Sequence, residues 1–485
     1  MLPLKKYFGL LLLLPLLTVS CGNKTDTGTE QKKMNVLFIA VDDMKPDLGC
    51  YGDNFVVSPN IDKLAEEGVV FANNQCQQAV CGPSRASLLT GWRPDRTEVW
   101  DLHTLIRDRN PDVVTLPQYF KQHGYQTAAR GKIFDLRSVD TMHDKISWSS
   151  PYEYPEKRRW IGTKEKLITQ NLDLPDSAFI DGNIVQQGIK LLEKMSKSDK
   201  PFFLAVGFKK PHLPFVAPKK CWDLYDRNEI KLAEFRKHAK NAPEFAFQPG
   251  WELRSGYDHV PQKGPIPEEM QKELIHGYYA CISHTDQQIG KLLNKLDSLG
   301  LRKNTIVILW GDHGWHLGDH SMWCKHTNFE QATRAPLIIS TPKIKGNKKT
   351  YSPTEFVDIY PTLCELAGIK TPDGLDGKSL VPLMKNSNGK IKEYAVSQFN
   401  RSFGKEKIEG YSIRTDKYRF TVWVPRSVRE GADFDKTKIV AKELYDYEKD
   451  PLEKINHYNE PEYKEIQKKL ENYMKEYFLN RKKKG

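Results

Sequence analysis

Short, continuously apolar runs recur along this chain of 485 residues, and most of them end at charged side chains. The runs occupy residues 35–41, 201–207, 305–310 and 335–340. Uninterrupted apolar stretches of this length are typical of strands buried on both faces of a sheet. The segments between them have helical spacing, so we expect an α/β fold in which helices flank the sheet. Ligands of such sheets bind at the carboxyl ends of the strands.

Three of these runs bring chemically active side chains to that edge. The residues concerned are Asp42 and Asp43, Lys209, Lys210 and His212, and Asp312 and His313. Because the carboxyl ends of parallel strands meet, we expect these groups to converge on one site. A zinc site on His313, His316 and His320 is a competing interpretation. Gly314 and Gly318 argue against a helix there that would align such ligands.

The first residues of the chain have the pattern of an export signal. Two lysines precede an apolar run over residues 8–17, and small residues follow before Cys21. Since this pattern resembles a bacterial lipobox, we expect residues 1–20 to be a lipoprotein signal peptide and Cys21 to be lipidated. Residues 21–33 would be a flexible tether to the membrane, which places the protein in the periplasm. An uncleaved anchor helix is the alternative, although the apolar run is short for one.

The rest of the chain divides into two segments. We expect residues 34–390 to form the main, catalytic domain. Residues 391–485 contain short strands and a charged helix, which predicts a smaller α+β domain. The formal net charge of +12 suits a polyanionic partner, but composition alone does not separate nucleic acid from acidic glycans. The eight cysteines include no Cys-x-x-Cys pair, so neither a zinc ribbon nor a thioredoxin-type site is indicated.

The segment from Cys81 to Gly91 is the most informative motif. It is predicted to enter a helix with Pro83 in the first turn and Gly91 at the end. Cys81 would then lie at the positive end of the helix dipole, where anions bind. A structural cysteine ahead of a capped helix is the alternative. A cysteine-phosphatase loop requires arginine at the position of Ser87, and a Walker A loop is absent.

Residues 81–85 (Cys-Gly-Pro-Ser-Arg) resemble the Cys-x-Pro-Ser-Arg signature of type I sulfatases, and residues 88–91 complete its longer form. Further similarities occur in order along nearly the whole mature chain. They lie at Asp42-Asp43, Gly131-Lys132, Lys210-Pro211-His212, residues 311–314 and Lys325. Three segments resemble the branch of iduronate-2-sulfatases and related uronate-2-O-sulfatases, namely residues 207–215, 356–364 and 410–415. The resemblance implies an alkaline-phosphatase-like fold with a large mixed sheet, and hydrolysis of sulfuric esters.

In that family a maturase converts the signature cysteine to formylglycine (3-oxoalanine), which would be Cys81 here. One hydroxyl of the hydrated aldehyde attacks sulfur, and the other then expels sulfate. The resemblance also implies one divalent cation, held by Asp42, Asp43, Asp312 and His313 beside the modified Cys81. Carboxylates are hard ligands suited to Ca²⁺, the cation we expect, and less so here to Mg²⁺.

The resemblance assigns roles to the remaining residues. Lys132 and Lys325 would hold the sulfate oxygens as point charges. Arg85 would orient the hydrated aldehyde, and His212 would protonate the leaving oxygen. Weaker candidates for substrate contact are Lys210 and Trp315.

The chain departs from the resemblance at one position. This branch has the pattern Gly-Lys-x-Phe-His, whereas residues 131–134 are followed here by Asp135. The histidine that polarises the diol in the family is therefore missing. Asp135 could replace it as a base, His143 could reach in from the next loop, or the activity or substrate could differ.

We expect an exported, lipid-anchored sulfatase that acts on acidic glycans. Its substrate would be the 2-O-sulfate of iduronic or another uronic acid, saturated or unsaturated, in heparan/heparin or dermatan/chondroitin sulfate oligosaccharides. A maturase would be its protein partner, and nucleic acid would not bind. One alternative is a phosphomonoesterase or phosphonate hydrolase of the same fold, which usually has threonine or serine in place of Cys81. The other is a non-catalytic glycan-binding lipoprotein, for which Asp135 is the only supporting feature.

Peptide mass spectrometry across Cys81 tests the predicted modification. In protein from a host with a maturase, conversion of the thiol to the aldehyde lowers the residue mass by about 18 Da, whereas cysteine oxidation raises it. The hydrated form regains one water and should be searched as well. Unmodified Cys81 in a host that matures a control sulfatase would contradict the mechanism.

Overall fold

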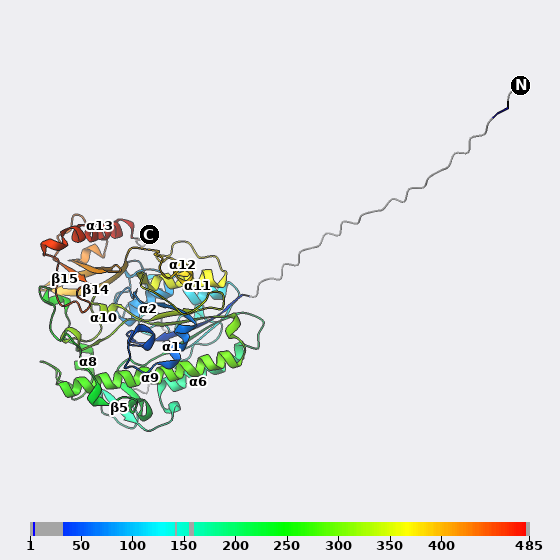
Figure 1. Ribbon diagram of the computed structural model, residues 1–485, viewed down its shortest axis with the longest axis horizontal. Helices are drawn as coiled ribbons and strands as arrows, with labels where there is room; N and C mark the ends of the chain where they lie inside the picture. Colours follow the sequence, from blue (N-terminus) through cyan, green and yellow to red (C-terminus); the bar gives the residue numbers. More distant parts are fainter. Residues whose placement is uncertain (1–2, 5–32, 141–142, 155–159, 482–485) are drawn as a thin grey trace. The chain divides into compact units, whose positions relative to one another are not determined.

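A seven-stranded mixed sheet lies at the centre of residues 33–485 in the computed structural model (Figure 1). Its strands, in spatial order, are β12 (Lys348–Thr350), β2 (Gly68–Phe71), β11 (Leu337–Ser340), β8 (Thr305–Gly311), β1 (Asn35–Val41), β6 (Phe202–Phe208) and β4 (Gln126–Gly131). Strands β8, β1, β6 and β4 are parallel, whereas β11 is antiparallel to both β8 and β2. The four apolar runs are confirmed as β1, β6, β8 and β11, whose residues are all buried.

Helices cover both faces of this sheet. The odd-numbered residues of β1 pack in one apolar cluster with α1 (Pro59–Glu66), α6 (Ile180–Met195) and α9 (Glu268–Ser298). The even-numbered residues pack in a second cluster with α2 (Cys81–Thr90), α5 (Leu116–Gln122), α11 (Ile359–Ala367) and α12 (Val381–Lys385). Helices α9 and α6 run alongside each other in Figure 1. This arrangement confirms the expected α/β fold.

The carboxyl ends of the four parallel strands meet at one edge, and each leads into a predicted site residue. The sequence predicts no strand at β4, because its six residues are largely small or polar. Gly131 ends β4 with φ +75°, and a Cβ at this position would lie 2.0 Å from the carbonyl oxygen of Gly207. Only glycine permits this approach. Gly131 thereby lets the chain turn so that Lys132 follows at the sheet edge.

A second, antiparallel sheet lies in the last hundred residues. It contains β14 (Ala395–Phe403), β15 (Glu406–Arg414), β16 (Tyr418–Pro425) and β17 (Ala441–Asp446). Helix α13 (Lys464–Asn480) packs on it through Leu470 and Met474. The smaller α+β unit is confirmed, while its boundary at residue 390 stays a prediction.

The helix that the sequence indicates over residues 354–367 begins later in the structure. Thr354–Glu355 forms the short strand β13, Phe356–Asp358 a 3₁₀ turn, and only then does α11 begin. Glu355 is completely buried and accepts hydrogen bonds from Arg93 (2.8 Å) and Lys392 (2.7 Å). Arg93 and Lys392, which donate to the buried Glu355 carboxylate, are distant from it in the sequence. The local helical pattern therefore does not reveal this arrangement.

The structure describes residues 3–4, 33–140, 143–154 and 160–481. The expected signal peptide cleavage region and Cys21 lie outside these residues. Among the described helices, none combines the length and the apolar character needed to span a bilayer.

Arg419 anchors the second sheet to the main one. Its side chain is 1% exposed, with Nε 2.9 Å from Glu453 Oε1 and Nη2 2.5 Å from Glu330 Oε2. We expect Arg419→Ala to lower the free energy of unfolding by about 3–5 kcal/mol, because the fully buried Glu453 loses its ion-pair partner and Glu330 is left with the ion pair to Arg414. Urea titration measures this loss.

The matched control is Arg302→Ala. Arg302 is 25% exposed and pairs with Asp297 at 2.8 Å and Glu67 at 3.3 Å near the surface, where a loss below about 1 kcal/mol is expected. Equal losses in the two variants would contradict a special role for Arg419.

Candidate active site

Cys81 is the first residue of α2, a helix in which all ten residues are buried. Its Sγ lies 3.4 Å from Asp42 Oδ1, 3.7 Å from Asp43 Oδ1 and 3.4 Å from His313 Nε2. Burial, reinforced by Asp42, raises the pKa of the Cys81 thiol well above its usual value. The unmodified side chain is therefore a neutral thiol at physiological pH, which is a weak nucleophile.

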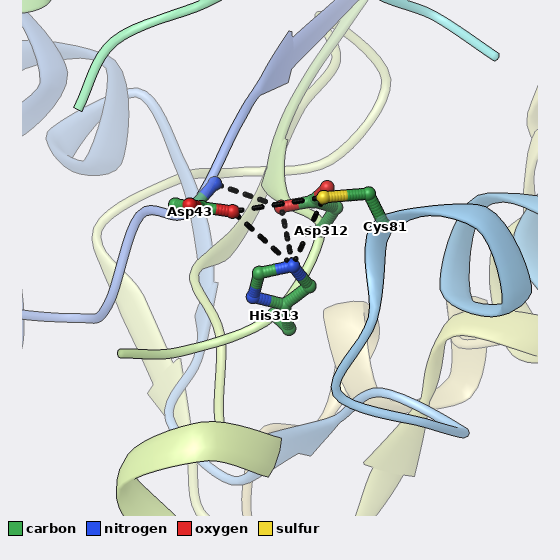
Figure 2. A group of neighbouring side chains, drawn as sticks. All are labelled: Asp43, Cys81, Asp312 and His313. Carbon is green, nitrogen blue, oxygen red and sulfur yellow. Dashed lines mark hydrogen bonds and ion pairs between the residues drawn. The ribbon is translucent and has the colours of Figure 1, made fainter. Parts of the chain in front are cut away.

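Four side chains surround one point at the end of β1 and β8. The donor atoms of Asp43, Cys81, Asp312 and His313 all lie within 4.8 Å of one another, and Figure 2 shows these side chains directed toward each other. Asp42, Asp43 and His212 form an adjoining group of the same kind. Buried carboxylate oxygens with one imidazole are a donor set that fits a hard divalent cation. The residues predicted to hold the cation are thus brought together.

Asp43 has an unusual backbone conformation, with φ +60°. Its N–H donates to Asp312 Oδ1 at 2.9 Å, and its carbonyl accepts from the Tyr278 hydroxyl at 2.7 Å. These two bonds offset the cost of left-handed backbone at a non-glycine residue. Burial raises the pKa of Asp43 to about 6, although Lys325 acts in the opposite direction.

Three ammonium groups lie against the two aspartates. Lys132 Nζ is 2.8 Å from both oxygens of Asp42, Lys209 Nζ is 2.7 Å from Oδ2 of Asp42, and Lys325 Nζ is 2.9 Å from both oxygens of Asp43. Burial alone would raise the pKa of Asp42, but Lys132 and Lys209 outweigh it and hold the pKa well below its usual value. Asp42 is therefore ionised across the physiological range.

Arg85 ties the nucleophile helix to the sheet edge. Its Nε donates to Asp312 Oδ2 at 2.9 Å, and its Nη2 donates to Asp42 Oδ1 at 3.3 Å. Its Nη1 donates to the carbonyls of Lys132 and Ile133 at 2.6 and 2.9 Å. The guanidinium is fully buried. It thus fixes both aspartates relative to α2, which supports the predicted orienting role.

His212 presents one ring nitrogen to the site. Its Nδ1 lies 2.6 Å from the Leu213 carbonyl, so this nitrogen carries the proton of the neutral ring and Nε2 faces inward. Nε2 lies 3.8 Å from Asp43 Oδ2 and 3.5 Å from Glu252 Oε1. Burial and Lys209 lower the pKa of His212 well below its usual value. The ring becomes an acid only when added negative charge favours its protonation.

The two weaker candidates have different positions. Lys210 lines the cavity, but its Nζ donates to the carbonyls of His212 (2.8 Å) and Pro214. Trp315 is 1% exposed and lies beneath Lys325, whose Nζ is 4.9 Å from the ring centroid. It is absent from the residues that line the cavity, so its contact is with Lys325. His316 bonds Thr327 at 2.9 Å instead of joining a metal-binding group with His313.

Asp135 does not replace the missing histidine as a base. Burial favours its neutral form, but Lys132 and Arg137 outweigh burial and strongly lower the pKa of its carboxyl. Both of its oxygens accept hydrogen bonds from Arg137. His143 stacks on Tyr152 with ring centroids 4.9 Å apart, and it is not among the cavity-lining residues. Neither substitute is supported by the geometry.

Lys209, which follows β6 directly, is predicted at the site, whereas two other site residues escape the sequence analysis. Glu252, on the short helix α8 (Trp251–Gly256), contacts Lys325 at 3.2 Å but belongs to no strand end or motif. Tyr278 comes from the middle of α9. Only the folded chain brings these residues to the site.

A cavity of about 330 Å³ opens above Cys81. Its wall is strongly cationic, with Lys132, Lys209, Lys210 and Lys325 among the lining residues, and Trp251 and Tyr257 on one side. A small, anionic, sugar-sized ligand fits this combination of charge and aromatic surface.

Comparison with known proteins agrees with this geometry. Residues 34–369 match the Sulfatase family, and residues 318–480 match the C-terminal region of N-sulphoglucosamine sulphohydrolase. The chain belongs to the sulfatase family. Human iduronate 2-sulfatase is 36% identical to it, over 93% of this chain and 95% of the human protein. Membership makes the protein a sulfuric ester hydrolase, as the resemblance predicted.

Solved structures bear out the fold. A structure described as a 2-O GAG sulfatase aligns with a TM-score of 0.68 at 23% identity, covering 92% of each chain. Phosphonate monoester hydrolase of Agrobacterium radiobacter aligns with a TM-score of 0.74 at 20% identity, covering 91% of this chain and 95% of the other. At these identities the similarity concerns the fold alone, which is the expected alkaline-phosphatase-like one.

Arg85→Lys tests the orienting role. Lysine retains the charge but cannot bond Asp42, Asp312 and two carbonyls together. We expect kcat/KM on an aryl sulfate to fall by at least about a hundredfold, because a buried charge-assisted network is broken. Since Arg85 lies in the same segment as Cys81, the two proteins are compared at equal levels of any Cys81 modification that mass spectrometry detects. Activity within about threefold of wild type would be inconsistent with this role.

Proposed function

We propose that this sulfatase removes the 2-O-sulfate of iduronic or another uronic acid from glycosaminoglycan oligosaccharides. The observation that carries the proposal is the similarity to iduronate 2-sulfatase along nearly the full length of both chains. The cationic cavity supports it, since the substrate would bring both a sulfate and a carboxylate.

We further propose that Cys81 acts as formylglycine with one Ca²⁺ beside it. When present, these two groups supply a nucleophilic hydroxyl and neutralise sulfate charge. The position of Cys81 supports this, because it lines the cavity and its Sγ lies within 4.8 Å of donor atoms of Asp43, Asp312 and His313. Asp43, Asp312 and His313 would hold the cation, and Asp42 would complete the set.

The chain's own residues account for the remaining steps. Lys132 and Lys325 contact Asp42 and Asp43 and line the cavity beside Cys81, where their ammonium groups would hold the sulfate oxygens. His212 Nε2 is the proton donor to the leaving sugar oxygen once the bound sulfate favours the protonated ring. Arg85 holds α2, Asp42 and Asp312 in fixed positions relative to one another during the reaction.

Export and lipid anchoring at Cys21 remain part of the proposal. The pattern in residues 1–21 supports them, and an extracytoplasmic site would give access to large glycans. The phosphonate hydrolase alternative is supported by fold similarity only. No contact among the described residues specifically favours phosphonate hydrolysis.

Hydrolysis of matched disaccharides tests the substrate. We expect kcat/KM for a 2-O-sulfated uronate to exceed that for a 6-O-sulfated glucosamine by at least about tenfold. One additional charge-assisted contact, made by the uronate carboxylate, is sufficient for a factor of this size. Sulfate release measured by ion chromatography provides the rates. Preference for the glucosamine ester, or for a phosphate ester, would overturn the proposal.

Removal of the cation tests the metal. We expect EDTA to lower activity at least about tenfold, and Ca²⁺ to restore it better than Mg²⁺, because Ca²⁺ tolerates an irregular set of oxygen ligands and Mg²⁺ demands near-octahedral geometry. Full activity in metal-free buffer, verified by elemental analysis, would refute a metal requirement.

A further inference from the structure

Arg137 is a cationic side chain in the cavity wall in addition to the four lysines, on the loop that follows Lys132. It lines the same cavity as Cys81, and its side chain is 53% exposed. The lysines around Cys81 are by contrast almost buried, with Lys132 5% and Lys325 3% exposed. Arg137 thus faces the space where the sugar would lie, and not the point of sulfur attack.

Asp135 fixes the orientation of Arg137. Oδ1 of Asp135 accepts from the backbone N–H and Nε of Arg137 at 3.1 and 2.9 Å, and Oδ2 accepts from Nη2 at 2.9 Å. The same Oδ2 lies 3.4 Å from Lys132 Nζ. One buried carboxylate therefore stands between the ammonium of Lys132 and the guanidinium of Arg137.

The loop itself is anchored on both sides of the arginine. The N–H of Ser138 donates to the Asp135 carbonyl at 3.0 Å, and the N–H of Ile106 donates to the Ser138 carbonyl at 3.0 Å. A Cβ on Gly82, in the first turn of α2, would lie 2.7 Å from Ser138 Oγ. The loop therefore packs directly against the start of the nucleophile helix. Such preorganisation reduces the entropy lost when a ligand binds.

The bonds to Asp135 use Nε and Nη2 of Arg137. Within the described part of the chain, the Nη1 edge is left for a ligand, whereas Arg85 in the same site uses all three nitrogens. A guanidinium edge that is held in place and open to a cavity suits a carboxylate or sulfate group.

We propose that Arg137, held by Asp135, is a specificity-determining residue that binds a second anionic group of the sulfated sugar. This inference rests on the proposed function and deepens it: the second anion is the uronic acid carboxylate. In a 2-O-sulfated uronate, the carboxylate on C5 lies across the ring from the sulfate on C2. Arg137 Nη2 and Lys132 Nζ both contact Asp135 Oδ2, at 2.9 and 3.4 Å, so two cationic groups lie close enough to reach two anionic groups of one sugar. Asp135 thus stands where the family has a proton-handling histidine, and it orients an arginine that binds an anion.

Substrate pairs that differ only in the second anion test this inference. The first pair is a 2-O-sulfated uronate and the same sugar with its carboxylate reduced to an alcohol. The second pair is glucosamine with two sulfate groups and with one. Wild-type enzyme should prefer the dianionic member of the first pair by about ten- to a hundredfold in kcat/KM, as one charge-assisted contact provides. Arg137→Ala should reduce this preference at least about tenfold, with Arg137→Lys intermediate.

Arg236→Ala is the matched control, since Arg236 is 41% exposed and pairs with Glu268 at 2.7 Å outside the cavity wall. It should leave the preference unchanged. Calorimetric binding of the 2-O-sulfated uronate to Cys81→Ala protein, with and without Arg137→Ala, provides a readout independent of turnover. The double variant should bind at least about tenfold more weakly.

Three outcomes would overturn the inference. The first is a wild-type enzyme without preference for the dianionic member of either pair. The second is an Arg137→Ala variant that loses the same factor on both members, which would indicate a structural role or contact with the reacting sulfate. The third is an Arg137→Ala variant whose kcat/KM is unchanged on both members of the first pair.

Failure of the proposed function gives a different pattern. The enzyme would then reject the 2-O-sulfated uronate yet hydrolyse a sulfated glucosamine. In that case the second pair decides whether Arg137 reads a second sulfate. A preference for the disulfated sugar that Arg137→Ala abolishes would retain the anion-binding role and replace the carboxylate as its ligand.

Discussion

Buried carboxylates at one edge of the sheet need cations beside them, and the architecture of the site follows from that need. Asp42, Asp43 and Asp312 are completely buried. Removing a carboxylate from water costs several kcal/mol unless charge and hydrogen bonds compensate. The compensation comes from residues that lie far apart in sequence, Lys132, Lys325 and Arg85 among them. The chain must therefore close completely before any one of these charges is stable.

The same charges serve stability and binding. The ammonium groups that neutralise the aspartates also line the cavity, and each is held by a different element. A ligand with oxygen anions meets preoriented donors and needs little rearrangement of the protein. The cost is that the site tolerates few changes, because loss of one partner leaves an uncompensated charge inside the protein.

Much of this arrangement can be predicted from the sequence, and the reasons are local. Strands β1, β6 and β8 are continuous apolar runs, and the polar residues directly after them must lie at their carboxyl ends. The family resemblance adds Cys81, Arg85, Lys132 and Lys325. Strand β4 has no apolar run, and its place depends on the close approach of Gly131 and Gly207.

Other features depend on tertiary contacts that no local pattern encodes. Glu252 reaches Lys325 from a two-turn helix, and the Tyr278 hydroxyl reaches Asp43 from the interior of α9. Asp135 and Arg137 are two positions apart in the sequence, yet the role of their ion pair depends on the cavity that both residues line. A departure from a motif indicates that a role has changed, and only the surrounding structure indicates what replaced it.

The burial of Cys81 has a consequence for the order of events in biosynthesis. The residue is 1% exposed and begins a helix that is buried along its whole length. Arg85 in the same helix bonds the Lys132 carbonyl, and Gly82 packs against the loop at Ser138. A protein that modified this side chain would reach it more easily before α2 packs against its neighbours. The timing of such a modification would therefore compete with the rate at which the domain closes.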